Sequence, residues 1–315
     1  MTRKILLTGA SGYIGGSVLH DLKSSVEEQV EVSALVRSIK ARDAVLQMTV
    51  KPIHFDGLHD LESIEKAASE HDIVISCASS MDEASCVALI RGLGKRKLQH
   101  HGEVYYIHTS GTSNFGDHPI SGTSVDVVRS DEDDIFGWEK ENAEGWITRA
   151  VDVAVINAGE EFDVRTAIVN PPIIYGKGNG PLHQTSIQIP ALIKVSLHFK
   201  QAVVVGDGQG VWNYTHINDV SSFYCHLVQL ILENRPLKFG KTGYYFPESG
   251  QVSWREISER IAEAGFAQGL FEKQDLKPLT TDELCQAIGI SFLNPSMVEV
   301  IWASNARING IKSRQ

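Results

Sequence analysis

Three glycines near the start of the chain have a spacing that suits a phosphate-containing dinucleotide. Gly9, Gly12 and Gly15 follow the apolar run 5–7 and precede residues 18–22, whose apolar positions have helical spacing. Gly9 permits a tight turn after a strand, Gly12 lets the backbone approach a pyrophosphate, and Gly15 lets the helix pack closely on the sheet. The free N–H groups and the positive dipole end of such a helix attract the anion. The segment therefore predicts a dinucleotide site formed by Gly9, Ser11, Gly12, Tyr13, Ile14 and Gly15.

The end of the next expected strand indicates which dinucleotide is bound. Residues 31–37 have a strand pattern that ends at Arg37, and Lys40 and Arg42 follow closely. An acidic side chain at this place would hydrogen-bond the ribose of NAD, whereas a guanidinium can pair with the 2′-phosphate of NADP. A basic residue in the first turn of a helix faces an unfavourable dipole, which also favours a bound anion there. We therefore expect NADP(H) in preference to NAD(H); the alternative is that Arg37 is a solvated residue without a ligand.

Alternating strand and helix patterns predict the scaffold that positions these residues. Up to about residue 169, apolar strand runs alternate with helical patterns, as in a doubly wound parallel sheet. We expect strands at residues 5–7, 31–37, 50–55, 72–78, 103–108 and 164–169, and helices at residues 61–68, 84–98 and 148–158. The charged segment 129–144 is expected to be an exposed loop that leads into a helix.

The pattern changes after Asn170. Prolines and glycines interrupt the alternation there, and mainly short strand and helix patterns follow. We therefore expect an α/β protein of the Rossmann type with a smaller C-terminal substrate lobe over the carboxyl edge of the sheet. The predicted NADP-binding domain comprises residues 1–172 and 201–237, and the predicted substrate lobe comprises residues 173–200 and 238–315.

The composition excludes several classes of protein. The formal net charge of -10 argues against nucleic-acid binding, because a phosphate backbone requires a basic face. No apolar stretch has the length of a membrane span, and the first residues are needed for the fold and so are not a secretory signal. The 4 cysteines lack metal-ligand spacing, so we expect free thiols in a reducing compartment and no metal. These features favour a cytoplasmic protein with a small-molecule substrate, with a homodimer as one option for its assembly.

Six segments together resemble the extended short-chain dehydrogenases/reductases of the NAD-dependent epimerase/dehydratase type. They are residues 8–15, 56–57, 76–79, 108–111, 170–176 and 215–220. The resemblance implies that Asp56 lies at the adenine side of the cofactor and that Ala78 and Ser79 line the cofactor groove. It also implies that the segment from Asn170 passes the nicotinamide and that residues 216–220 close the fold from the second lobe. Further cofactor contacts are expected from Gly57, Thr109 and Pro171.

The catalytic half of the family pattern is missing from the sequence. Family members that oxidise alcohols or reduce ketones use a tyrosine and a lysine four residues later, on the helix before the sixth strand, and a serine or threonine after the fifth. In this chain the tyrosine and lysine places fall near Glu144 and Thr148, and the serine place falls at Gly111. The chain thus resembles the atypical branch of the superfamily, which includes the NmrA-like proteins.

Several residues are candidates for the missing chemistry. Tyr175 could donate a proton, Ser110 and Thr112 could orient a carbonyl or iminium, and Arg149 could replace the lysine electrostatically or pair with Asp152. The alternatives are a structural role for the tyrosine and hydroxyls that bond the loop backbone. Glu144 could act as an acid or base if it is shielded, or it could belong to a solvated surface with Glu139 and Glu141. Substrate contacts are expected from Lys177, His183 and His216, with solvation of the lysine and a core hydrogen bond for His216 as alternatives.

These features predict an atypical NADP-dependent oxidoreductase that reduces a carbonyl, imine or enone of a small organic molecule. Two other functions stay open. One is an NADP(H)-binding redox sensor without turnover, which the missing tyrosine and lysine support. The other is a non-redox cyclase or isomerase built on the cofactor cleft. The loop 176–189 and the lobe after Pro247 are large enough to enclose a substrate, which favours an enzyme.

Overall fold

A parallel sheet forms the centre of the computed structural model, which describes residues 2–26, 29–122, 124–125, 127–291 and 293–314. The sheet has seven strands in the order β11-β7-β5-β4-β1-β2-β3, and each neighbouring pair is parallel. These strands are β1 (Arg3–Thr8), β2 (Val30–Val36), β3 (Lys51–His54), β4 (Ile73–Ser76), β5 (Tyr105–Thr109), β7 (Arg165–Val169) and β11 (Tyr244–Tyr245). The order reverses at β1, so the prediction of a doubly wound α/β fold is confirmed.

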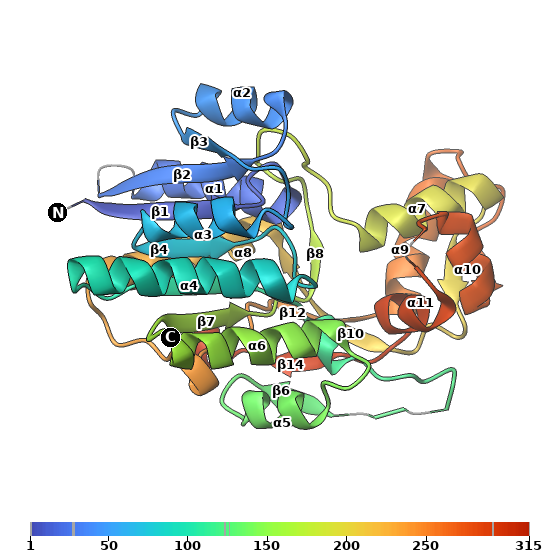
Figure 1. Cartoon of the computed structure of the whole chain (residues 1–315). Coiled ribbons are helices and arrows are strands. Elements are labelled where there is room, and N and C mark those ends of the chain that lie inside the picture. The colour runs from blue at the N-terminus through green and yellow to red at the C-terminus, as the bar shows by residue number, and fades with distance from the viewer. Residues whose placement is uncertain (1, 27–28, 123, 126, 292, 315) are drawn as a thin grey trace.

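Helices cover both faces of this sheet (Figure 1). Ile5 and Leu7 pack on one face with α1 (Tyr13–Ser25), α2 (Ile39–Gln47) and α8 (Ile217–Leu232). Leu6 points to the other face, where α3 (Leu61–Ser69), α4 (Glu83–His100) and α6 (Ile147–Glu161) pack. Burial on both faces explains why the central strands are apolar almost throughout.

A second group of elements has its own hydrophobic core. Its helices α7 (Gln188–Phe199), α9 (Trp254–Ala267), α10 (Thr281–Ile288) and α11 (Pro295–Trp302) gather at the right of Figure 1, beyond one end of the sheet. Its strands are β8 (Ile173–Tyr175), β9 (Val203–Val205), β10 (Val211–His216), β12 (Gly250–Ser253) and β13 (Lys277–Leu279). Because β9 pairs with β13, residues 203–205 pack with this group, whereas α8 packs on α1.

The segment 129–144 differs from the exposed loop that the sequence predicts. It contains β6 (Val128–Ser130), which pairs with β14 (Arg307–Asn309), and the helix α5 (Ile135–Glu141). Ile135, Phe136, Asp131 and Glu139 are buried in it. Asp131 is accommodated because it accepts backbone N–H bonds from Ile311 and Lys312 at the other end of the chain. The expectation of an exposed segment is therefore wrong for these four buried residues, whereas Asp133, Asp134 and Glu144 are exposed as expected.

None of the described helices combines the length and the apolar character that are needed to cross a membrane.

Candidate functional site

The glycine-rich loop between β1 and α1 has no room for side chains at two of its positions. Gly9 has a φ of +72°, and a Cβ built on it would lie 2.5 Å from the carbonyl oxygen of Cys77. A Cβ on Gly15 would lie 2.4 Å from the carbonyl oxygen of Gly9. The N–H of Gly12 donates to Gly9 O at 2.8 Å, and Gly12 is the N-cap of α1. The loop is thus a tight turn that leaves the first N–H groups of α1 available to an anion.

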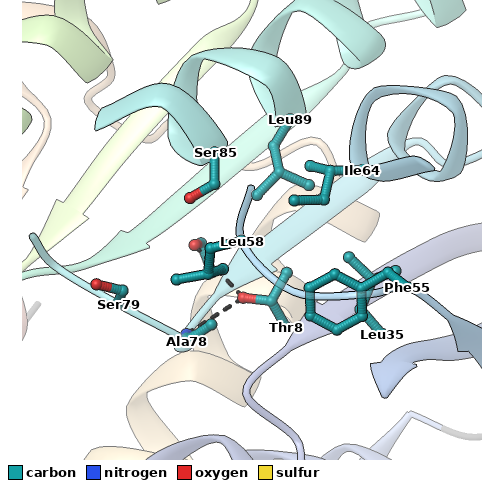
Figure 2. Close-up of a pocket in the computed structure, with 10 residues that line it drawn as sticks. Thr8, Leu35, Phe55, Leu58, Ile64, Ala78, Ser79, Ser85 and Leu89 are labelled. Carbon is teal, nitrogen blue, oxygen red and sulfur yellow. Dashed lines mark hydrogen bonds between the residues drawn. The ribbon is translucent and has the colours of Figure 1, made fainter. Parts of the chain in front are cut away.

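An apolar pocket lies beside this loop at the carboxyl ends of β1, β2 and β4 (Figure 2). The Thr8 hydroxyl ties two of these strands together, because it accepts from the N–H groups of Cys77 and Ala78 at 3.1 and 3.2 Å. The pocket is lined by Thr8, Leu35, Phe55, Leu58, Ile64, Ser76, Ala78, Ser79, Ser85 and Leu89. The cavity is small, with a volume of about 10 Å³, which is room for about one water molecule.

Most of that lining was missed by the sequence analysis, which identified only Ala78 and Ser79 there. Leu35 near the end of β2, and Phe55 and Leu58 after β3, are ordinary core residues by type. A signal was nevertheless present, because they stand next to the carboxyl ends of parallel strands, where ligands bind in open α/β sheets. Asp56 itself is exposed and borders this region.

A basic side chain without a protein partner lies next to this pocket. Arg37 follows β2 directly and is exposed, and it makes no hydrogen bond or ion pair with any other described residue. Arg42, by contrast, pairs with Asp43 at 2.8 Å. A Cβ built on Gly57 would lie 4.0 Å from Arg37 Cδ and 3.0 Å from the ring of His59, so both side chains border Gly57.

The segment after β8 lies directly on the glycine-rich loop. The Tyr13 hydroxyl donates to Gly176 O at 2.7 Å, and the N–H of His183 approaches Ser11 O at 3.3 Å. A Cβ on Gly180 would lie 2.7 Å from the Cα of Gly16, so the backbones are in contact. The predicted substrate segment and the predicted phosphate loop are therefore adjacent.

The predicted proton donor Tyr175 packs against His216, one of the three predicted substrate residues. The Tyr175 ring lies edge-on to that of His216, with ring centroids 5.1 Å apart, and 41% of the tyrosine is exposed. His216 Nδ1 accepts from the N–H of Asn218 at 3.2 Å and so caps α8. Its ring also covers Gly176, which has a φ of +92°. The other two predicted substrate residues, Lys177 and His183, are exposed.

The loop that follows β5 is tied to two buried carboxyl groups. The Ser110 hydroxyl donates to Asp152 Oδ2 at 2.6 Å. Asn114 Nδ2 donates to Asp152 Oδ2 at 2.8 Å and to Glu139 Oε1 at 2.7 Å. The Tyr244 hydroxyl donates to Glu139 Oε2 at 2.8 Å. The sequence suggested a solvated surface around Glu139, but Glu139 is buried and bonds Tyr244 and Asn114. Asp152 bonds Ser110 and Asn114 in the same cluster.

Burial changes the acidity of these groups. It raises the pKa of Asp152 to about 7. Burial, together with the negative charge of Asp152, raises the pKa of Glu139 well above its usual value. Each of these carboxyl groups thus holds its proton to a higher pH than it would in water.

Arg149 also differs from its predicted environment. Its Nε donates to Asn114 O at 2.7 Å, and an Nη donates to Asn142 O at 3.1 Å. Its guanidinium lies over the rings of Trp146 and Trp138, at 3.9 and 4.6 Å from their centroids. Burial lowers its pKa to about 10. The guanidinium thus holds the loop backbone.

The remaining predicted positions have separate environments. The Thr109 hydroxyl contacts that of Tyr224 at 2.7 Å, and the Thr112 hydroxyl is buried without a hydrogen-bond partner among the described residues. Glu144 is exposed, and the Thr148 hydroxyl donates to Asn114 Oδ1 at 2.5 Å. Asn114 thus connects the loop after β5 to α6 at several points, which its sequence context did not indicate.

Comparisons with known proteins place the chain among relatives. The family model described as "NAD dependent epimerase/dehydratase family" matches residues 145–237. Oxidase ucsJ of Acremonium sp is 32% identical to the chain over 98% of its length and 90% of the oxidase. The uncharacterised protein YLL056C of Saccharomyces cerevisiae is 26% identical over 82% of the chain and 80% of that protein.

Solved structures show the same fold at low sequence identity. A dTDP-glucose 4,6-dehydratase of Bacillus anthracis, in complex with NAD, has a TM-score of 0.63 at 15% identity and covers 99% of this chain and 89% of its own. A UDP-glucose 4-epimerase of Thermotoga maritima, solved with UDP-glucose, has a TM-score of 0.60 at 14% identity, with 99% and 91% covered. With the relative that is 32% identical over nearly the whole chain, these matches show that the chain belongs to the NAD-dependent epimerase/dehydratase family of extended short-chain dehydrogenases/reductases.

Proposed function

We propose that this protein is an NADP-dependent oxidoreductase that reduces a polarised double bond of a small organic molecule. The observation that carries the proposal is Arg37, which is exposed at the end of β2 and has no partner among the described residues. The name of the oxidase relative supports redox chemistry, since the two sequences align over nearly their full lengths.

The residues present fit a dinucleotide. Gly9 and Gly15 form a cradle that any Cβ would fill, and the start of α1 offers its N–H groups to the pyrophosphate. In this proposal the adenine lies at the carboxyl ends of β2 and β4, beside the small apolar pocket, and the Arg37 guanidinium pairs with the 2′-phosphate. Several structures of similar fold were solved with NAD, so the choice of NADP depends on Arg37. When bound, the nicotinamide supplies the hydride.

The reacting end of the groove lies at the carboxyl ends of β5 and β7. Ser110, Thr112, Pro171 and Tyr175 come from the segments that follow these strands and the adjoining β8. The partly exposed phenol of Tyr175 is the proton donor in this proposal, because the Ser110 hydroxyl is already donated to Asp152. Lys177 and His183 contact the substrate from the exposed loop, and the second group of elements forms the substrate lobe. That group includes β9 and β10, whereas β11 belongs to the central sheet, so the lobe departs from the predicted bounds 173–200 and 238–315.

Calorimetry with NADPH and NADH tests the cofactor assignment. Arg37→Ala should weaken NADPH by about ten- to a hundredfold, because a charge-assisted hydrogen bond contributes roughly 1.5–3 kcal/mol, and should leave NADH nearly unchanged. Arg42→Ala is the matched control, since Arg42 is also exposed but is paired with Asp43. Equal losses for both nucleotides, or no binding of either, would contradict the proposal.

Turnover tests the reaction class. NADPH absorbance is followed with panels of ketones, enals and cyclic imines, and oxidation of NADPH is expected with one of them. The second candidate function is a redox sensor that binds NADPH without turnover. It is favoured by Glu144 and Thr148 at the places of the family's tyrosine and lysine. Conversion of a substrate with no change in NADPH would instead identify a cyclase or isomerase.

A further inference from the structure

Six buried polar side chains meet beneath the loop that follows β5, and we call them the acid cluster. They come from β5, the loop itself, the short helix η1 (Thr112–Phe115), α5, α6 and β11. The members are His108, Ser110, Asn114, Glu139, Asp152 and Tyr244, and none is more than 9% exposed. Two carboxyl groups without water need compensation by donors or by protons, because an unpaired buried charge is costly.

An inventory of the carboxyl oxygens shows where compensation is incomplete. Both oxygens of Glu139 and Oδ2 of Asp152 accept hydrogen bonds from Tyr244, Asn114 or Ser110. Asp152 Oδ1 and His108 Nε2 lie 3.4 Å apart, and neither has a hydrogen-bond partner among the described residues. A hydrogen on the carboxyl group, or on Nε2 of a neutral His108, would complete a bond between them.

The described hydrogen bonds to the two carboxyl groups all come from neutral donors. Arg149 is close enough to act on Glu139 electrostatically, but its hydrogen bonds go to the backbone carbonyls of Asn114 and Asn142. The other groups that face the cluster are neutral or weakly acidic. They are Cys86 of α4, whose Sγ is 3.9 Å from His108 Nδ1, Tyr106 of β5, which stacks on His108, and the side chain of Asn170.

We propose that Glu139 and Asp152 jointly keep one proton at neutral pH, and that this proton holds residues 110–115 in place at the reacting end of the cofactor groove. The proton is shared by the pair and is not assigned to either residue, because strongly interacting sites titrate together. Both residues are positioning residues in this scheme, since they act through Ser110 and Asn114. The second part of the inference rests on the proposed function, whereas the first part does not.

The direction of the pH dependence follows from the raised pKa values. The unfolded chain releases these protons near the ordinary carboxyl pKa of about 4, whereas the folded chain holds them to higher pH, because the pKa of Asp152 is raised to about 7 and that of Glu139 well above its usual value. The unfolded state therefore binds fewer protons in between, and stability falls as the pH rises through this window. At higher pH, two adjacent negative charges repel each other beneath the loop.

Asp152→Asn and Glu139→Gln test the shared proton. An asparagine at 152 keeps an acceptor for Ser110 and Asn114 and can donate to His108 Nε2, so it imitates the protonated acid. Each variant removes one of the two carboxyl groups whose pKa is raised, and so removes the partner with which the proton is shared. The thermal unfolding midpoint, measured from pH 5 to pH 9, should fall with pH in the natural chain and much less in either variant.

Asp117→Asn is the matched control. Asp117 is also buried, but it lies outside the acid cluster, and its oxygens accept from Asn305 and from the N–H of Val125. This variant should lower the midpoint at every pH and keep the slope of the natural chain. The inference is overturned if both cluster variants keep the slope of the natural chain, as the control does. One folded variant is sufficient for this comparison.

Binding of two nucleotides tests the positioning role. NADP⁺ should weaken several-fold relative to 2′,5′-ADP between pH 6 and pH 8.5, because only NADP⁺ extends to the loop 110–115. Asp152→Asn should abolish this relative loss. A constant ratio in the natural chain overturns the positioning role. If neither nucleotide binds while the stability slopes change as expected, the proposed function fails and the shared proton stands.

Discussion

The two ends of the proposed cofactor groove are built in different ways. The phosphate end consists of backbone, glycines and one open cation, all from β1, α1 and the end of β2. The reacting end rests on the acid cluster, whose side chains come from elements spread between β5 and β11. The phosphate end therefore depends on the space that its glycines leave by having no side chain. The reacting end depends on the protonation of buried groups. Variants that remove space should act at every pH, whereas variants in the acid cluster should change the pH dependence.

Gly9→Ala should have the largest effect, because it acts on space alone. The new Cβ would meet backbone atoms of Cys77, and the φ of +72° adds strain. Overpacking and strain together should cost about 2–4 kcal/mol of stability, and NADPH binding should fall by at least about tenfold. Thermal unfolding and calorimetry measure the two losses.

Gly145→Ala is the control for backbone strain. Gly145 has a nearly equal φ of +74°, but nothing lies within 4 Å of its Cβ position. The alanine there should cost only about 1–2 kcal/mol and leave NADPH binding unchanged. If the two variants lose equal stability and equal affinity, crowding at the glycine-rich loop is not what defines the phosphate end.

This contrast explains how much the sequence alone could predict. The phosphate end is encoded in neighbouring residues, so the spacing of Gly9, Gly12 and Gly15 predicts both the turn and the sheet that holds it. The acid cluster is encoded at long range, since Asn114 and Asp152 are 38 residues apart and Glu139 and Tyr244 are 105 apart. No local pattern identifies such partners. For that reason the sequence predicts a solvated surface for Glu139, Glu141 and Glu144 alike, whereas Glu139 is buried and the other two are exposed.

Tyr244→Phe should sharpen the description of the acid cluster. It removes the donor to Glu139 Oε2 without changing the shape of the side chain, and a buried acceptor left unsatisfied costs about 1–3 kcal/mol. The tyrosine also lowers the pKa of Glu139, so its loss should raise that pKa further. Stability should then continue to fall to a higher pH than in the natural chain, as thermal unfolding at several pH values would show.

Tyr245→Phe provides the comparison for this variant. Tyr245 is buried next to Tyr244 in sequence, but its hydroxyl bonds the backbone of Lys238. Its loss should lower stability by a similar amount and leave the pH dependence as it was. The same pH profile in both phenylalanine variants would mean that Tyr244 does not act on the carboxyl pair.

Raising the salt concentration should have the smallest effect, and it tests the charge at the phosphate end. Arg37 is exposed and makes no hydrogen bond or ion pair with any other described residue, so salt should screen its attraction for the 2′-phosphate. The preference for NADPH over NADH should therefore fall about two- to threefold between low and high salt, and Arg37→Ala should lack this dependence. Calorimetry with both nucleotides at two salt concentrations measures the preference. A preference that does not change with salt would mean that the phosphate end selects its nucleotide by shape and not by charge.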